Sequence, residues 1–413
     1  MPCTWRKVDL MKKDFEKIGT IIESSSDELV ETMSGMISIK SVSPLSGGEG
    51  EKERADYLEK KLASWGIGAV RYDYTDESGA VRSNIVAKYG NCNRTLWIVA
   101  HIDTVAEGEI GLWKTDPYSA VVKDGRIYGR GTNDNGQEVI AGMFALKALR
   151  ESGAELKYNI GLALVADEEI GSKYGIQKLL DEPVFDGSGL FIVPDSGDRK
   201  GDKIEIAEKG ILWLRITVRG TQVHASTPEK GNNAYRHSIG FIGRIDKYLH
   251  ERYNASDDIF DPSISTFEPT KHEKNVDSVN IVPGVDISYI DCRVLPRYDL
   301  DEILGNLKRI ASEEFKGIEI SVDPILKEEA APPTGVNAEI VKELSSALKE
   351  VRGIDAKAIG IGGGTCAAFF RKKGFSAAVW STEDDVAHRA NEYAVISNII
   401  DDSKIFAYIC LKD

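Results

Sequence analysis

The chain has 413 residues, of which 66 are Asp or Glu and 52 are Lys or Arg, so its formal charge is −14 at pH 7. This length allows two or three domains with a large apolar core. The excess of negative charge argues against nucleic acid or an anionic membrane as a partner, because both would repel the chain.

The cysteines and the N-terminal segment indicate a cellular location. Residues 1–25 carry charges every few positions, whereas a signal peptide needs an apolar segment. No apolar run approaches the roughly 20 residues of a membrane span. The cysteines are scattered without a CxxC spacing, which favours a reducing compartment and gives no thiolate zinc site; they are Cys3, Cys92, Cys292, Cys366 and Cys410. We therefore expect a cytoplasmic protein.

Short apolar runs rich in Val, Ile and Leu alternate with helical patterns in much of the chain. Such runs occupy residues 95–105, 158–169, 189–197 and 375–385, and a helical pattern spans 137–153. Continuous apolar strands that alternate with helices predict an α/β fold, with a mainly parallel, mixed sheet covered by helices on both faces. In such a sheet, ligands bind at the carboxyl ends of the strands.

The pattern changes at about residue 211. Residues 211–226 and 285–296 alternate apolar and polar side chains, which is typical of antiparallel strands with one solvated face. We therefore predict an inserted α+β lid domain, 211–323, between two parts of one catalytic domain, 1–210 and 324–413. The solvated strands of the insertion also predict a homodimer formed through it.

Histidines and carboxylates stand at the ends of the apolar strands and in one glycine-rich turn before a helix. They are His101 and Asp103 in AHIDTV, Asp134 in GRGTNDNGQ, Glu168 and Glu169 in VADEEIG, Asp195 in VPDSG and His388 in AHRANEY. Each alone has an ordinary structural explanation, such as a capping residue in a turn. Because the carboxyl ends of parallel strands meet at one edge of a sheet, we expect these residues together to form a metal site.

Charge balance predicts two metal ions in this site. Four carboxylates in one cleft would force some of their number to take up protons, but two divalent cations would offset their charge. One carboxylate would bridge the metals, and each metal would gain a histidine and a further carboxylate. Oxygen and nitrogen ligands suit zinc, which cobalt or manganese could replace. Metals about 3.5–4 Å apart can share a water, lower its pKa and polarise a carbonyl group.

The stretch VADEEIG holds three consecutive acids. Adjacent side chains in an extended or turning backbone point apart, so one of Glu168 and Glu169 can bind metal while the other acts as a general base. Asp167 is then left as a solvated or capping acid.

The motifs above occur together with VHASTPEKGNNA, NIVPG, DCRVLP and GGGT. In this order they resemble the acetylornithine deacetylase, succinyl-diaminopimelate desuccinylase and glutamate carboxypeptidase family of dizinc metallohydrolases. The resemblance runs from about residue 38 to near the end of the chain. It implies two zinc ions per chain: His101 and Asp195 would bind one and Glu169 and His388 the other, with Asp134 as the bridge.

The resemblance also implies catalytic roles. Glu168 would be the general base and later the proton donor to the leaving amine, and Asp103 would orient His101. His224, in VHAS, would stabilise the oxyanion of the tetrahedral intermediate, and in dimeric members it comes from the partner subunit.

A further set of residues matches positions that hold the substrate carboxylate in this family; the set is Asn280, Arg293, Gly363, Gly364 and Thr365. The glycine-rich loop also has a physical rationale, since free backbone N–H groups at a helix start attract anions. Arg293 could equally form an ion pair within the lid. A nucleotide site in GIGGGT is the alternative for the loop, but Thr365 replaces the last glycine of GxGxxG.

One motif departs from the family. Many relatives carry Lys and Gly soon after the bridging Asp, whereas Asn135, Gly136 and Gln137 follow Asp134 here. The metal ligand is retained, and the departure affects the surroundings of the metals and the favoured substrate.

We therefore predict a dinuclear zinc amidohydrolase that cleaves the N-acyl bond of an amino acid, of the succinyl-diaminopimelate desuccinylase or acetylornithine deacetylase type. A hydroxide held by the metals would attack the amide, with Glu168 as general base. A metallo-carboxypeptidase or dipeptidase acting on a short peptide is the alternative within the family. A metal-binding module without catalysis is the alternative of another class, although it would have no need of Glu168.

Overall fold

The computed structural model describes residues 2–412, with side chains described from Met11 onward. The side chain of Cys3, one of the five cysteines of the sequence, therefore lies outside the described part. The chain forms two compact units. The large unit contains the residues up to Ile206, Thr334–Ala358 and the residues from Thr365 onward, and the small unit contains Ala207–Pro333 and Ile359–Gly364. All of the predicted insertion, 211–323, lies in the small unit.

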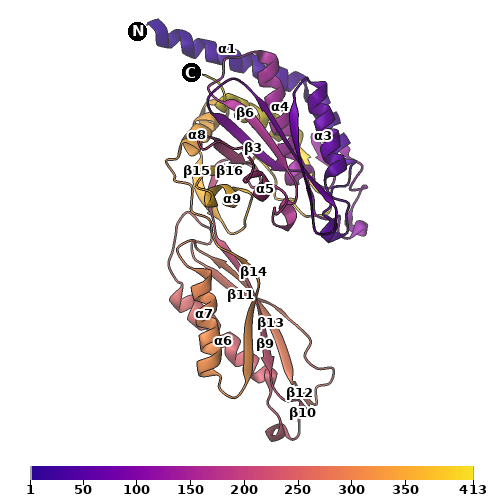
Figure 1. The fold of residues 1–413 in the computed structure, drawn as a ribbon, viewed down its shortest axis with the longest axis vertical. Coiled ribbons are helices and arrows are strands. Elements are labelled where there is room, and N and C mark those ends of the chain that lie inside the picture. Colours follow the sequence, from indigo (N-terminus) through magenta and orange to yellow (C-terminus); the bar gives the residue numbers. More distant parts are fainter. Residues whose placement is uncertain (1, 413) are drawn as a thin grey trace. The chain divides into compact units, whose positions relative to one another are not determined.

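The large unit is built on an eight-stranded sheet (Figure 1). Its order is β1 (Ala69–Thr75), β2 (Val81–Tyr89), β6 (Asn159–Val165), β3 (Thr95–His101), β7 (Leu190–Val193), β16 (Ala377–Val379), β8 (Lys203–Glu208) and β15 (Lys357–Ile361). The four central strands β6, β3, β7 and β16 are parallel, and every residue in them is buried. The predicted mainly parallel, mixed sheet is confirmed, because strands buried on both faces read as continuous apolar runs.

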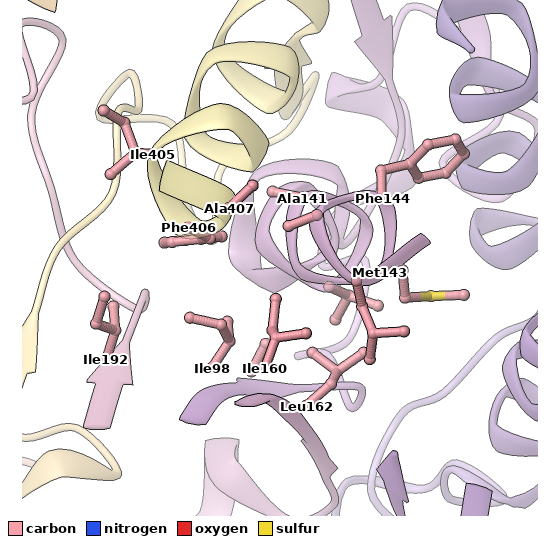
Figure 2. Close-up of a cluster of buried hydrophobic side chains, with 14 of the residues drawn as sticks. Ile98, Ala141, Met143, Phe144, Ile160, Leu162, Ile192, Ile405, Phe406 and Ala407 are labelled. Carbon is pink, nitrogen blue, oxygen red and sulfur yellow. The ribbon is translucent and has the colours of Figure 1, made fainter. Parts of the chain in front are cut away.

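Helices cover both faces of this sheet. They are α1 (Pro2–Ser24), α2 (Ser26–Ile37), α3 (Lys52–Ser64), α4 (Gln137–Ser152), α5 (Ile176–Leu179), α8 (Glu339–Arg352), α9 (Ala367–Lys372) and α10 (Ile396–Ile409). One core lies between the sheet and α4 and α10, and the other contains residues of α5 and α9. Figure 2 shows side chains of the first core, among them Ile98, Ile160 and Leu162 of the sheet, Ala141 and Met143 of α4, and Phe406 and Ala407 of α10.

Helix α4 is buried along nearly its whole length. Most of its residues are apolar, as expected for a helix enclosed by a core. Gly142 lets this helix approach the sheet closely, because a Cβ atom there would lie 2.7 Å from Leu162 Cδ1. Helix α4 begins at Gln137, directly after the loop that contains Asp134.

A small sheet supports the same region of the large unit. It contains β4 (Val121–Lys123), β5 (Arg126–Tyr128) and β17 (Tyr393–Val395), with β5 in the centre. The β5–β17 pairing brings the segment after His388 beside the Gly-rich turn before Asp134.

The small unit is an α+β structure, as predicted. Its antiparallel sheet has the order β11 (Thr266–His272), β13 (Val285–Val294), β9 (Gly210–Arg219) and β14 (Glu319–Glu328). Helices α6 (Ala234–Arg252) and α7 (Leu300–Glu314) pack on the sheet, and β10 (Val223–His224) pairs with β12 (Ile281–Val282). Buried and more exposed residues alternate along β13, which is typical of a sheet covered on one face.

No helix in residues 2–412 combines the length and the apolar character that crossing a membrane requires.

Two buried carboxyl groups join α4 to α10 in the core of the large unit. Glu138 and Asp402 are fully buried, and Glu138 Oε2 and Asp402 Oδ1 have no hydrogen-bond partner among the described residues. Gln137 Nε2 donates to Glu138 Oε1 at 2.7 Å, and Arg352 Nη1 is 3.8 Å from Asp402 Oδ1. Burial raises the pKa of Glu138 well above its ordinary value and raises that of Asp402 to about 7.

The carboxyl pair predicts a specific pH dependence of stability. Both folded-state pKa values lie above those of the unfolded chain. The contribution of these two groups to the free energy of unfolding is therefore fully present below about pH 4, and it is lost as the pH rises through the folded-state values. Glu138→Gln keeps the shape of the side chain but removes one of the two buried titratable groups. It should stabilise the protein by about 2 kcal/mol at pH 8, a shift of about 3 °C in Tm for a unit of this size, and have little effect near pH 4.

Thermal unfolding at several pH values checks this result. Glu151→Gln is the matched control, because Glu151 lies on the same helix but is exposed. A Glu138→Gln stabilisation of equal size at pH 4 and pH 8 would contradict the prediction.

Candidate metal centre

The first cluster of possible metal ligands joins three segments of the large unit. His101 is the last residue of β3, Asp195 follows β7, and Asp134 lies in the loop before α4. His101 Nε2 is 2.8 Å from Asp134 Oδ1 and 3.3 Å from Asp195 Oδ1. One ligand atom from each residue lies within 4.8 Å of the others. These three atoms therefore converge on one point, as a metal ion requires.

The second cluster shares Asp134 with the first. His388 Nε2 is 3.0 Å from Asp134 Oδ2 and 3.1 Å from Glu169 Oε2, and one ligand atom from each of these residues again lies within 4.8 Å of the others. The two oxygens of Asp134 thus face different histidines, Oδ1 toward His101 and Oδ2 toward His388. The structure brings together all five residues that the sequence suggests as ligands.

The titration properties of the clusters fit cations. Burial raises the pKa of Asp195 and of Glu169. Hydrogen bonds that His388 donates to the carboxylates of Asp134 and Glu169 raise its pKa to about 10. Carboxylates that hold protons on facing imidazoles favour positive charge at that point, and a divalent cation would supply it. The donor set contains oxygen and nitrogen without thiolate, and so suits zinc, cobalt or manganese.

Glu168 lies beside the clusters without belonging to either. It begins a short 3-10 turn, Glu168–Ile170, three residues after the end of β6. Burial raises its pKa well above the ordinary value, and the negative charge of Asp195 adds to this effect. A carboxyl group with a raised pKa can take up and release a proton near neutral pH, which general acid–base catalysis requires.

Asp103 does more than the sequence suggests. Its Oδ1 is 3.4 Å from His101 Nδ1, and its main-chain oxygen is 3.1 Å from the same nitrogen. The carboxylate also accepts the backbone N–H groups of Glu168 at 3.0 Å and of Glu169 at 3.1 Å. Asp103 therefore contacts the candidate ligand His101 and the turn that carries the candidate base and another candidate ligand.

Comparisons with known proteins place this site in a family. The family model described as Peptidase family M20/M25/M40 matches residues 97–412. The chain belongs to this family. An uncharacterized metallohydrolase of Methanocaldococcus jannaschii is 41% identical over 409 residues, which cover 94% of this chain and 99% of that protein. The M20 chain is thus a metal-dependent hydrolase that acts on amide bonds.

More distant relatives of the M20 chain include a succinyl-diaminopimelate desuccinylase of Alkalilimnicola ehrlichii, 24% identical over 384 residues that cover 92% of this chain and 97% of that protein. Among solved structures, an M20 family metallo-carboxypeptidase of Sulfolobus solfataricus has a TM-score of 0.72 at 23% identity, covering 92% of this chain and 98% of that one. The likeness to the solved structure confirms the fold.

Of the two alternatives for Asp167, a solvated or a capping acid, the solvated one is wrong for the M20 chain. Asp167 is not solvated: it is buried, its Oδ1 is 2.7 Å from Arg82 Nη1, and its Oδ2 accepts the backbone N–H of Tyr174 at 2.9 Å. Arg82 also forms an ion pair with the buried Glu51. The ion pair compensates the burial of Asp167, so the first acid of VADEEIG anchors the turn that begins with Glu168.

Glu392 is a buried residue of the M20 site that the motif analysis does not identify. Its carboxylate accepts the backbone N–H groups of Gly131 at 3.0 Å, Asn133 at 2.9 Å and Asp134 at 3.0 Å, and it pairs with Arg130 Nη1 at 2.5 Å. Burial raises its pKa to about 7. Glu392 thus fixes the loop that presents Asp134, the residue common to both clusters. The available signal was its place in AHRANEY, four residues after His388.

The residues suggested for oxyanion and substrate binding lie mainly in the small unit. His224 on β10 is exposed, and its Nδ1 accepts the backbone N–H of Ser226 at 3.1 Å, which leaves the proton on Nε2. Asn280 lies just before β12, and its main-chain oxygen accepts the N–H of Ala225 at 2.8 Å. The paired strands therefore hold His224 and Asn280 close together.

The remaining suggested residues have structural partners. Arg293 forms an ion pair with Asp291, with Nε 2.8 Å from Oδ1, and donates to the carbonyl oxygen of Gly362 at 3.0 Å. Thr365 belongs to the large unit and is buried, and its Oγ1 accepts the N–H of Ala367 at the start of α9. Gly363 and Gly364 belong to the small unit.

Proposed function

We propose that the M20 chain is a two-metal amidohydrolase that cleaves the N-acyl amide bond of an amino acid, with N-succinyl-diaminopimelate and N-acetylornithine as representative substrates. The observation that carries this proposal is the position of Asp134, whose two oxygens face two separate histidine and carboxylate pairs. The desuccinylase relative supports the choice of substrate class.

Each ligand has a defined place in the proposal. His101 and Asp195 would hold one divalent cation, Glu169 and His388 the other, and Asp134 both. Two such cations supply Lewis acidity toward the amide carbonyl and lower the pKa of a water molecule. Zinc suits these ligands best, with cobalt or manganese as substitutes.

Glu168 performs the proton transfers in this proposal. It accepts a proton from the attacking water as the bond between the water oxygen and the carbonyl carbon forms. It then donates that proton to the amide nitrogen as the C–N bond breaks, so that a carboxylic acid and an amine are released. The raised pKa of Glu168 suits both steps. Asp103 keeps the carboxylate in place through the backbone of the turn.

The family resemblance suggests further residues that would contact the substrate. His224 has a protonated Nε2 and could donate to the developing oxyanion. Asn280 and the Gly363–Thr365 segment would contact the substrate carboxylate. Arg293 would join them only by loosening its pair with Asp291, so we rank it last.

A metallo-carboxypeptidase or dipeptidase that acts on short peptides is the second candidate, supported by the metallo-carboxypeptidase among the solved structures. A metal-binding module without catalysis is a weaker alternative, because it would not need a carboxyl group such as Glu168 beside both clusters. The four unpaired cysteines in the described side chains support a cytoplasmic location. A homodimer through the small unit is also proposed, and sedimentation of the intact chain would test it.

A substrate panel tests the function. The protein, loaded with zinc or cobalt, is assayed with N-succinyl, N-acetyl and N-formyl amino acids and with dipeptides. Metal-dependent release of a free acyl acid is the expected result, and release of two amino acids would select the peptidase alternative. A protein that binds two metals per chain yet hydrolyses no member of the panel would contradict the proposed substrate class.

A further inference from the structure

The residue after the shared ligand contacts a second ligand. Asn135 is buried, and its Nδ2 donates to the carbonyl oxygen of Pro194 at 2.7 Å and to Asp195 Oδ1 at 3.1 Å. One side-chain amide therefore holds both the backbone and the carboxylate of the segment that ends β7. Since Asp134 directly precedes Asn135 in the chain, the positions of two ligands of one cluster are linked through a single residue.

The orientation of the Asn135 amide is determined by its neighbours. Its Nδ2 faces two oxygens, and its Oδ1 is buried and has no hydrogen-bond donor among the described residues. The opposite orientation would place an oxygen against the two acceptors. An aspartate at this position would do the same and would add a charge beside Asp195. The contact thus needs a neutral side chain of this shape with two N–H groups.

The backbone after Asn135 leaves it little freedom. A Cβ atom at Gly136 would lie 2.2 Å from the carbonyl oxygen of Gly131, and the Gly136 N–H donates to that same oxygen at 3.1 Å. The loop therefore closes tightly directly after Asn135, and no larger side chain fits at Gly136. This accounts for the glycine in the Asn135-Gly136-Gln137 departure from the family pattern.

We propose that Asn135 is a positioning residue that sets the orientation of the Asp195 carboxylate toward the metal it shares with His101. This inference rests on the proposed two-metal function. Asp195 Oδ1 lies 3.3 Å from His101 Nε2 and accepts the Asn135 N–H, so the amide holds this oxygen in the cluster. Hydrogen bonds to a ligating carboxylate typically change metal affinity by about 10–100-fold when removed.

Cobalt binding to metal-free protein tests the inference without reference to activity. Calorimetry and the visible absorption of bound Co²⁺ would follow each site. Asn135→Ala should lower the affinity for one of the two cobalt ions by about 10–100-fold and leave the affinity for the other unchanged. Asn135→Asp keeps the shape of the side chain but replaces the N–H donor, and it should lower the affinity for the same ion. Asn133→Ala is the matched control, because Asn133 is buried in the same loop and its Nδ2 has no hydrogen-bond partner among the described residues.

A double-mutant cycle assigns the effect to one cluster. The loss of cobalt affinity caused by Asn135→Ala should persist in a His388→Ala background, which removes the other site. It should vanish in an Asp195→Ala background. If both variants still bound two cobalt ions, and Asn135→Ala lost no more cobalt affinity than Asn133→Ala, this inference alone would be overturned. A wild-type protein that binds fewer than two cobalt ions would overturn the two-metal proposal as well.

Discussion

Replacing Glu168 with glutamine should lower kcat by about 10³–10⁴-fold and leave the metal content unchanged. Glutamine has nearly the same shape but cannot accept a proton from water or return it to the leaving amine. Glu168 belongs to neither ligand cluster, so its loss removes no metal ligand. Its backbone N–H donates to Asp103, and this bond does not depend on the side chain. The turn should therefore keep its conformation in the variant.

The neighbouring residue provides a matched control. Glu169→Gln alters a carboxylate that lies 3.1 Å from His388 Nε2, so this variant should lose affinity for the metal that it shares with His388. Metal analysis and steady-state kinetics on both variants separate the two roles. A Glu168→Gln protein with a near-normal rate, or one that loses metal while Glu169→Gln retains it, would show that the roles are assigned to the wrong residues.

The strand-end argument predicts that the candidate ligands lie together, because it depends on local sequence. His101 and Asp195 follow buried parallel strands, and buried parallel strands are recognisable as continuous apolar runs. Such strands place their carboxyl ends at one edge of the sheet, so residues 94 positions apart in sequence come within 3.3 Å of each other. The same argument cannot predict which acids of a loop face the edge.

Asp167 and Glu392 show where local sequence is insufficient. Asp167 has the composition of a solvated acid, and its burial depends on Arg82, 85 residues earlier in the chain. Glu392 accepts N–H groups from residues 258 to 261 positions earlier, and backbone donors leave no trace in the amino-acid sequence. Both residues are defined by distant partners, which only the folded chain reveals.

The substrate-binding residues remain a prediction for a similar reason. From the sequence, Arg293 could form an ion pair within the lid or bind the substrate. In the structure its guanidinium group pairs with Asp291. On the antiparallel strand β13 these two residues lie two positions apart and therefore on the same face. A sequence pattern with this spacing indicates an ion pair as readily as an anion site.

Replacing Asp134 should have the broadest effect on metal binding. Asp134 is the one residue common to both ligand clusters, with Oδ1 2.8 Å from His101 Nε2 and Oδ2 3.0 Å from His388 Nε2. Asp134→Ala removes both oxygens. It should reduce the metal content from two ions per chain to fewer than one, whereas His101→Ala and His388→Ala should each retain one.

Metal analysis after dialysis against a fixed zinc concentration measures these contents. The Asp134 loop should stay folded in the variant, because Glu392 binds the backbone N–H of residue 134 and not its side chain. Turnover should fall to background along with the second metal, since both the carbonyl and the attacking water then lose their activating cation. An Asp134→Ala protein that keeps two zinc ions would show that the two clusters bind independently, and Asp134 would then not be a bridging ligand.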